Sequence, residues 1–473
     1  MTSVSEPQAF RVYGWIACIW ILVVSFQYGY HISALNQIQA VLTCGNSATG
    51  PTLYYGLPTC IPMSDATFSV VTSVYTVGGL SGSLGANLVM DRWGRKGAVL
   101  TSSVAMAFGA GMMGVAASLT PLVIGRLVTG MGAGLGLCVG PIFLSEIAPP
   151  KKRGTVGVLT QFAIVVGIMV TQGMGLQLAS ARHWRLVLLF SAVLSLAQLL
   201  CAPMMIESPT WLNRHGQLQA KDTAARRLWK SEQMIRSADV SNYDTEDPLL
   251  STQNDDEDIE HQLPKDPEEH EAAISVPRLL IAPELRRPLA IVCFSMLCQQ
   301  LSGINAVLYY SNDILSKALP DLGPYISLGI TVVNVIATAA PVLLIDRYGR
   351  RQLLSLSAGG AFLSLLGVGI GLDSSLITLA SVAILTFVAS FAIGIGPVPF
   401  VMIPEVSPHH AVSALSSVGL STNWIANFLV GLVFLPLRNL LAQGDPSKEG
   451  RVFYVFAAML FCSTFVLFRV YRG

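Results

Sequence analysis

Apolar runs of membrane-spanning length recur through this chain and restrict what it can fold into. Crossing a bilayer as a helix takes about 20 apolar residues, and soluble domains carry about 25% charged residues. Of the 473 residues here, 52% are hydrophobic and 12% charged. We therefore predict an all-α membrane protein with twelve spans, near 12–36, 66–90, 97–118, 121–146, 155–179, 184–206, 288–316, 322–345, 352–372, 376–404, 409–437 and 451–470.

A polar stretch divides these runs into two sets of six. We expect an N-terminal half at 1–206, a linker at 207–287 and a C-terminal half at 288–473. The linker contains "STQNDDEDIEHQLPKDPEEHEAA", an acidic, proline-containing run that should be largely disordered. The first ten residues lack a basic region and a cleavage site, so we expect no removable signal peptide.

Basic residues in the short loops predict the orientation of the chain. "DRWGRKG", "PPKKRG" and "DRYGRRQ" carry three basic residues each, and the loop between the third and fourth runs carries none. The positive-inside rule places these loops, both termini and the linker in the cytosol. The "ARHWR" turn is an exception on the opposite side, which we interpret as a local anchor with Trp184 at the membrane interface.

Two motifs occur twice at nearly the same separation. "DRWGRKG" starts at Asp91 and "DRYGRRQ" at Asp346, 255 residues later. Glu146 of "GPIFLSEIAP" is followed 259 residues later by Glu405 of "GPVPFVMIPEVSP". This duplication indicates parallel six-helix repeats with a substrate site near the midplane between them.

Several motifs together resemble the sugar porter branch of the major facilitator superfamily. They are the two D-R-x-G-R loops, "GRLVTGMGAG", "EIAPPKKRG", "IESPTWL" and above all "QQLSGINAVLYYS". "QYGYHISALN", followed by "VLTC", is also similar to a fungal group of vacuolar sugar carriers close to the facilitative glucose transporters. The resemblance implies the major facilitator fold and sugar transport by alternating access.

Three amides in one span suit the recognition of hydroxyl groups. Gln299 and Gln300 are adjacent, and Asn305 follows five residues later. An amide both donates and accepts hydrogen bonds without a charge, and charge is costly at membrane depth. Gly303 would let the helix bend there. The alternative interpretation is that the amides only join helices.

The resemblance implies a fuller set of sugar-lining residues. Gln161, Ile164 and Ile168 share one helical face by their spacing alone, which also favours a lining role. Phe400 takes the wall position that is usually tryptophan. The implied set is Gln161, Ile164, Ile168, Gln299, Gln300, Ile304, Asn305, Asn334, Phe400, Trp424 and Asn427.

The chain departs from the family pattern in its second half. Ala392 replaces the usual glutamate, Val412 replaces the usual arginine after Glu405, and no P-E-T-K sequence follows the last run. These departures leave the identity of the substrate and the strength of gating open.

Charged residues at the cytosolic helix ends predict a gate. Opposite charges there can bridge helices in one state and separate in the other, although topogenic charge and helix capping are an alternative role. The predicted gate comprises Asp91, Arg92, Arg95, Glu146, Arg153, Glu207, Asp346, Arg347, Arg350 and Glu405, with Arg214 as a further candidate.

His31 determines the expectation for proton coupling. By resemblance, proton-linked sugar porters have an aspartate at this position, facing an arginine that is Arg126 here. Repulsion from Arg126 and desolvation should keep the imidazole neutral. We therefore expect facilitated diffusion, with proton coupling as the alternative, and we expect Tyr28 and Ile32 to line the cavity.

Other functional classes fit the sequence less well. "GMGAGLG" lies inside a span, where small residues allow close helix packing, and we find no nucleophile set or metal-ligand spacing. We expect no enzyme activity, cofactor, metal or nucleic-acid partner, and a monomer in the bilayer that binds a small sugar. A polyol carrier and a non-transporting sugar sensor are the remaining alternatives.

Two sequence features bear on the cellular membrane in which the protein resides. Cys44 and Cys60 bracket a polar loop and could form a disulfide if that loop faces an oxidising compartment. "EDPLLS" in the linker is similar to a dileucine sorting signal. Together with the fungal resemblance it favours a vacuolar or other internal membrane, with the plasma membrane as the alternative.

Overall fold

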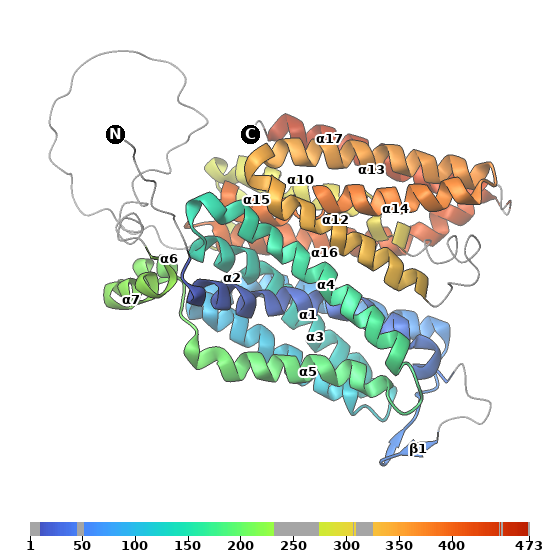
Figure 1. The fold of residues 1–473 in the computed structure, drawn as a ribbon, viewed down its shortest axis with the longest axis horizontal. Helices are drawn as coiled ribbons and strands as arrows, with labels where there is room; N and C mark the ends of the chain where they lie inside the picture. Colours follow the sequence, from blue (N-terminus) through green and yellow to red (C-terminus); the bar gives the residue numbers. More distant parts are fainter. Residues whose placement is uncertain are drawn as a thin grey trace.

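The computed structural model describes residues 10–44, 52–230, 274–305, 307–308, 325–443, 445 and 448–471. Most of these residues are helical, and the elements form two sets. In Figure 1 the blue-to-green helices occupy the lower part of the bundle and the yellow-to-red helices the upper part, with α4 and α12 side by side between them. These sets are called the N-half and the C-half below.

The N-half contains five long helices and one short hairpin. Its elements are α1 (Val12–Leu42), β1 (Leu53–Tyr54), β2 (Leu57–Pro58), α2 (Asp65–Gly114), α3 (Leu119–Ile147), η1 (Pro150–Lys152), α4 (Arg153–Leu178), α5 (Trp184–Cys201) and η2 (Ala202–Met204).

Short helices follow the N-half and precede the C-half. They are α6 (Pro209–Arg214), α7 (Leu218–Leu228), α9 (Val276–Ile281) and η3 (Pro283–Leu285). The C-half comprises α10 (Arg286–Leu301), α12 (Ile326–Tyr348), α13 (Arg350–Asp373), α14 (Ile377–Ile393), α15 (Val398–Val406), α16 (Val412–Ala442) and α17 (Arg451–Val470).

The number of spanning helices differs from the sequence expectation. Ten helical segments in the described part of the chain are long and apolar enough to cross a membrane, against twelve expected. One reason is that α2 covers 66–90 and most of 97–118. It is interrupted only at Gly94, whose φ of 74° and ψ of −177° are not helical. The other is that α10 has 16 residues, and the part of the expected run beyond residue 308 lies outside the described residues.

The expected linker is helical at both described ends, in α6, α7 and α9. Its acidic run at 251–273 lies outside the described residues. In Figure 1, α6 and α7 lie at the same end of the bundle as the start of α1 and the end of α17, and the hairpin lies at the opposite end. We call these the α7 end and the hairpin end.

Small residues bring the N-half helices into backbone contact. A Cβ atom on Gly134 of α3 would lie 2.0 Å from the carbonyl oxygen of Gly79 in α2, so no larger residue fits at this crossing. Similarly, a Cβ atom on Gly29 of α1 would lie 1.9 Å from the carbonyl oxygen of Ile164 in α4. The expectation that "GMGAGLG" serves close packing is confirmed.

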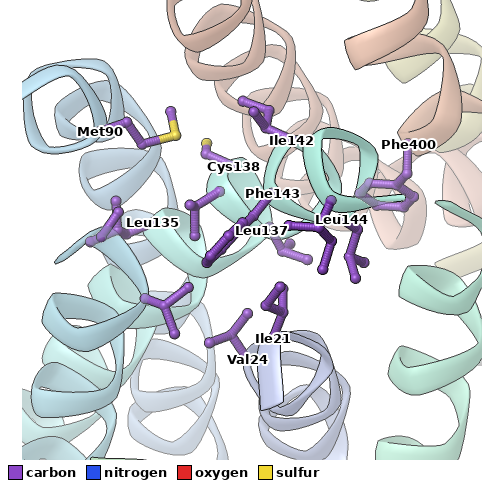
Figure 2. Close-up of a cluster of buried hydrophobic side chains, with 14 of the residues drawn as sticks. Ile21, Val24, Met90, Leu135, Leu137, Cys138, Ile142, Phe143, Leu144 and Phe400 are labelled. Atoms are coloured by element: carbon purple, nitrogen blue, oxygen red, sulfur yellow. The ribbon is translucent and has the colours of Figure 1, made fainter. Parts of the chain in front are cut away.

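An apolar cluster surrounds α3 and extends across the boundary between the halves. Figure 2 shows Ile21 and Val24 of α1 and Met90 of α2 around the side chains of α3, with Phe400 of α15 beside Leu144. The C-half therefore contributes directly to the N-half core near the α7 end.

The loop at the hairpin end is fixed to the bundle. Cys44 and Cys60 form a disulfide, and the Trp184 Nε1–H group donates to the Thr59 carbonyl oxygen at 2.7 Å. Arg185 donates to the Pro58 carbonyl oxygen at 2.8 Å. Trp184 is fully buried, so the expectation that it lies at a membrane interface is wrong; it packs beneath the loop instead.

Candidate functional site

The three amides of the "QQLSGIN" motif lie in one hydrogen-bonded network with α16. Asn305 Nδ2 donates to Gln300 Oε1 at 3.0 Å and to Asn427 Oδ1 at 2.9 Å. Gln299 Nε2 donates to the Gly396 carbonyl oxygen at 2.8 Å. As expected, α10 ends before Gly303, whose φ is 76°, and this break brings Asn305 towards Gln300 and α16.

Asn423 completes this network, and the sequence reasoning missed it. Its Nδ2 group donates to Gln299 Oε1 at 2.8 Å, and its Oδ1 atom accepts from Gln300 Nε2 at 3.1 Å. Asn423 precedes Trp424 in "STNWIAN", so its amide character was the available signal. In this conformation the amide side chains hydrogen-bond to one another. They therefore form a preformed group of donors and acceptors that a ligand could engage.

An aromatic group joins this region of the C-half to the N-half. The Trp424 ring lies edge-on to Tyr28 of α1 at 5.6 Å and to Tyr75 of α2 at 5.8 Å between centroids. Trp424 is buried, and its Nε1–H group has no hydrogen-bond partner among the described residues. A flat apolar face with a free donor suits a sugar ring and its hydroxyl groups.

The other expected lining residues occupy several helices. Gln161 and Ile164 are buried on α4, with Ile168 half-buried on the same face. Ile304 is also buried. Asn334 is buried on α12 and accepts a long bond of 3.4 Å from Thr338.

Two expected cavity residues differ in their exposure. Phe400 is buried in the cluster of Figure 2, close to Leu144. Ile32 is exposed on α1, one turn beyond the buried Tyr28 towards the hairpin end. Along α1, the Tyr28 side chain is therefore covered by its neighbours and the Ile32 side chain is not.

Two equivalent ion pairs lie at the α7 end, one within each half. Arg95 Nη2 lies 2.8 Å from Glu146 Oε1, and its Nε–H group donates to both carboxylate oxygens. Arg350 makes the same forked contact with Glu405, with Nε at 3.0 Å and 2.9 Å from the two oxygens. The sequence repeat is therefore also a structural repeat.

The aspartate of each repeated loop reaches across to the other half. Asp346 of α12 accepts from the backbone N–H of Thr155 at 3.0 Å and from its hydroxyl at 2.6 Å. Asp91 of α2 likewise lies beside the Ser413 side chain, in the first turn of α16. Carboxylates are favoured at helix N-termini, where backbone N–H groups are unpaired. The two hydroxyl partners were not predicted from the sequence.

Glu207 holds the chain at Gly94. Its Oε1 atom accepts from the backbone N–H groups of Arg95, Lys96 and Ser208 at 2.9, 3.1 and 2.7 Å. Burial raises the pKa of the Glu207 carboxyl above its ordinary value, and the N–H donors of Ser208 and Lys96 oppose that rise.

The remaining gate candidates divide into two groups. Arg153, the first residue of α4, lies near Glu405 and so faces the C-half. Arg92 and Arg347 are exposed, and the structure does not bring them into the ion-pair network. Val412, where the family pattern has arginine, is buried at the start of α16, and Ala392 is buried in α14.

His31 lies in a buried polar network between α1 and α5. Its Nε2 atom is 2.8 Å from the Ser191 hydroxyl, which donates to Gln27 Oε1 at 2.9 Å. Ser195 donates to the same Gln27 oxygen at 2.7 Å. Arg126 lies over the Tyr75 ring, with Cζ 4.3 Å from its centroid. These partners of His31 were not predicted.

Comparison with known families matches almost the whole chain. The family model described as "Sugar (and other) transporter" matches residues 17–472. A probable metabolite transport protein of Saccharomyces cerevisiae is 31% identical over 456 residues, covering 94% of this chain and 88% of that protein. The facilitated glucose transporter member 4 of Mus musculus is 33% identical over 494 residues, covering 99% and 90%.

Solved structures share the fold at lower sequence identity. The proton:xylose symporter XylE bound to 6-bromo-6-deoxy-D-glucose superposes with a TM-score of 0.74. The identity is 17%, and the match covers 96% of this chain and 95% of that chain. At this identity the likeness shows the major facilitator fold alone.

Proposed function

Because the chain belongs to the sugar transporter family, we propose that it carries a hexose across a membrane by facilitated diffusion. The observation that carries this proposal is the uncharged amide network of Gln299, Gln300 and Asn305 beside Trp424. Amide donors and acceptors next to an aromatic face match a ring of hydroxyls with apolar faces. Relatives named as facilitated glucose transporters support the same substrate class.

The transport mechanism that we propose is alternating access. The N-half and C-half rock about the amide site, and the ion pairs and cross-half aspartate contacts at the α7 end close one route. We propose twelve spans. They are the ten segments described above, with α2 counted as two spans at Gly94, and one further span that includes α10. In this arrangement both termini and the α7 end face the cytosol, in agreement with the basic loops.

The absence of an acidic group in the middle of the N-half supports uncoupled transport. The acidic residues within α1 to α5 are Asp65, Asp91 and Glu146, at a helix start, at the Gly94 break and at a helix end. His31 occupies the position near Arg126 and bonds Ser191. Arg126 opposes a second positive charge at His31, so this residue serves as a hydrogen-bonding group.

A transport assay tests the proposed substrate class. The purified full chain in proteoliposomes should exchange labelled glucose for internal unlabelled glucose. Sugar-free vesicles and protein-free liposomes are the controls. Exchange of a polyol but not of glucose would support the alternative substrate class, and binding of sugar without exchange would support a sensor.

We further propose an internal membrane, such as that of the vacuole, with the hairpin end in its lumen. The Cys44–Cys60 disulfide supports an oxidising environment at that end. Imaging of a tagged full chain tests the membrane, and a uniform plasma-membrane signal would contradict this location.

A further inference from the structure

Arg126 is a buried cation with unused hydrogen-bond donors. It is 2% exposed, and neither its Nε nor its Nη1 atom has a hydrogen-bond partner in the described part of the chain. The Tyr75 ring beneath the guanidinium partly compensates the charge but accepts no conventional hydrogen bond. Burying a donor without a partner is unfavourable, so these N–H groups would be stabilised by an acceptor.

His31 supplies the complementary unused acceptor. The Ser191 hydroxyl has one proton and donates it to Gln27 Oε1, so its oxygen accepts from the Nε2–H group of His31. A neutral imidazole protonated at Nε2 has an unprotonated Nδ1. The Nδ1 atom is buried and has no partner among the described residues.

The two unused groups lie around one aromatic ring. The His31 ring is 6.3 Å from Tyr75 between centroids, and the Arg126 Cζ atom is 4.3 Å from the Tyr75 centroid. Tyr75 in turn meets Trp424 at 5.8 Å, beside the amide network. The pair therefore borders the proposed sugar site from the N-half side.

One kind of chemical group has the hydrogen-bonding capacity that both residues lack. A hydroxyl accepts through its oxygen and donates its proton, which matches an N–H of Arg126 and the lone pair of His31 Nδ1. An anion would satisfy Arg126 but would face the His31 lone pair. The pairing of a free donor with a free acceptor therefore selects a neutral hydroxyl.

We propose that His31 and Arg126 form a subsite for one hydroxyl group of the transported sugar, with Arg126 donating and His31 accepting. This inference rests on the proposed function and adds an N-half contact to the amide site. A water molecule has the same hydrogen-bonding chemistry, so the experiment must distinguish a sugar hydroxyl from a bound water.

A series of monodeoxy glucose analogues provides that distinction. In proteoliposomes, each analogue competes with labelled glucose for counterflow in the wild type and in the His31→Leu variant. In the wild type, the analogue that lacks the bound hydroxyl should compete about tenfold more weakly than glucose, equivalent to about 1.4 kcal/mol. In His31→Leu, that one difference should disappear while the differences for the other analogues remain.

The outcomes separate the possible explanations. If His31→Leu discriminates among the analogues as the wild type does, the subsite is overturned and only a bound water remains. An equal loss of affinity for every analogue has the same meaning. If the wild-type protein shows no glucose counterflow, the proposed function itself is contradicted.

If His31→Leu does not fold, Arg126→Lys gives a second test, because it keeps the charge and removes the guanidinium fork. His183→Leu, at an exposed histidine of the hairpin end, is the matched control.

Discussion

The Arg95 guanidinium holds the Glu146 carboxylate through Nε and Nη2, and the two side chains are 1% and 6% exposed. The equivalent pair of the C-half, Arg350 and Glu405, is 22% and 26% exposed. The same motif therefore forms one buried and one partly solvated ion pair. Their energetic contributions should differ accordingly.

We predict that Arg95→Ala destabilises the protein far more than Arg350→Ala. Removing one partner of a buried pair leaves an uncompensated charge and costs about 3–5 kcal/mol. The solvated pair should contribute about 1 kcal/mol or less. Thermal unfolding of the two purified variants in detergent provides the measurement. Equal decreases in Tm would contradict the difference in burial.

Gly154 should control closure of the α7 end. A Cβ atom at this position would lie 2.1 Å from Asp346 Oδ1, across the boundary between the halves. Gly154→Ala should therefore weaken the Asp346–Thr155 contact and favour opening at this end. A cysteine at the buried Val401, with the six free cysteines replaced, should react faster with maleimide in this variant. Unchanged reactivity would show that the contact does not limit opening.

The amide network predicts a graded loss of transport. Gln299→Ala and Asn305→Ala should abolish sugar uptake while leaving membrane abundance intact, because they remove expected sugar contacts. Asn423→Ala should retain uptake with KM raised about tenfold, because it releases Gln299 and Gln300 without removing them. Uptake kinetics and surface quantification measure this series. Wild-type uptake in Gln299→Ala would remove that residue from the site.

Glu207 should make the stability of the protein depend on pH, and the sign of that dependence follows from its raised pKa. Because its folded pKa is raised, its contribution to stability is present below the unfolded pKa of about 4.3 and is lost as pH rises through the folded value. Glu207→Gln keeps an acceptor for the three N–H donors and removes the titration. The Tm of the variant relative to the wild type should therefore increase with pH over that window. A relative Tm that falls with pH would contradict the assignment.

The sequence predicted the helical segments because hydrophobic length determines them directly. It also located the repeated Arg–Glu pairs, since both partners lie in duplicated motifs. It did not show that α2 would continue around Gly94, because the conformation of that glycine depends on Glu207, more than a hundred residues later.

Residues whose roles depend on tertiary neighbours were not predictable. Ser413 and Thr155 are ordinary hydroxyl residues in the sequence and become aspartate partners only where the halves meet. Asn423 joins the amide network only because α16 packs against α10. Trp184 was expected at an interface, but the fixed loop covers it.

Proton movement during sugar exchange tests the central claim most directly. Proteoliposomes containing the purified chain and an internal pH indicator receive an inward glucose gradient with no pH gradient. Facilitated diffusion predicts glucose entry and counterflow with no change in internal pH and no current. Acidification of the lumen that depends on glucose and on the protein would contradict it and establish proton coupling.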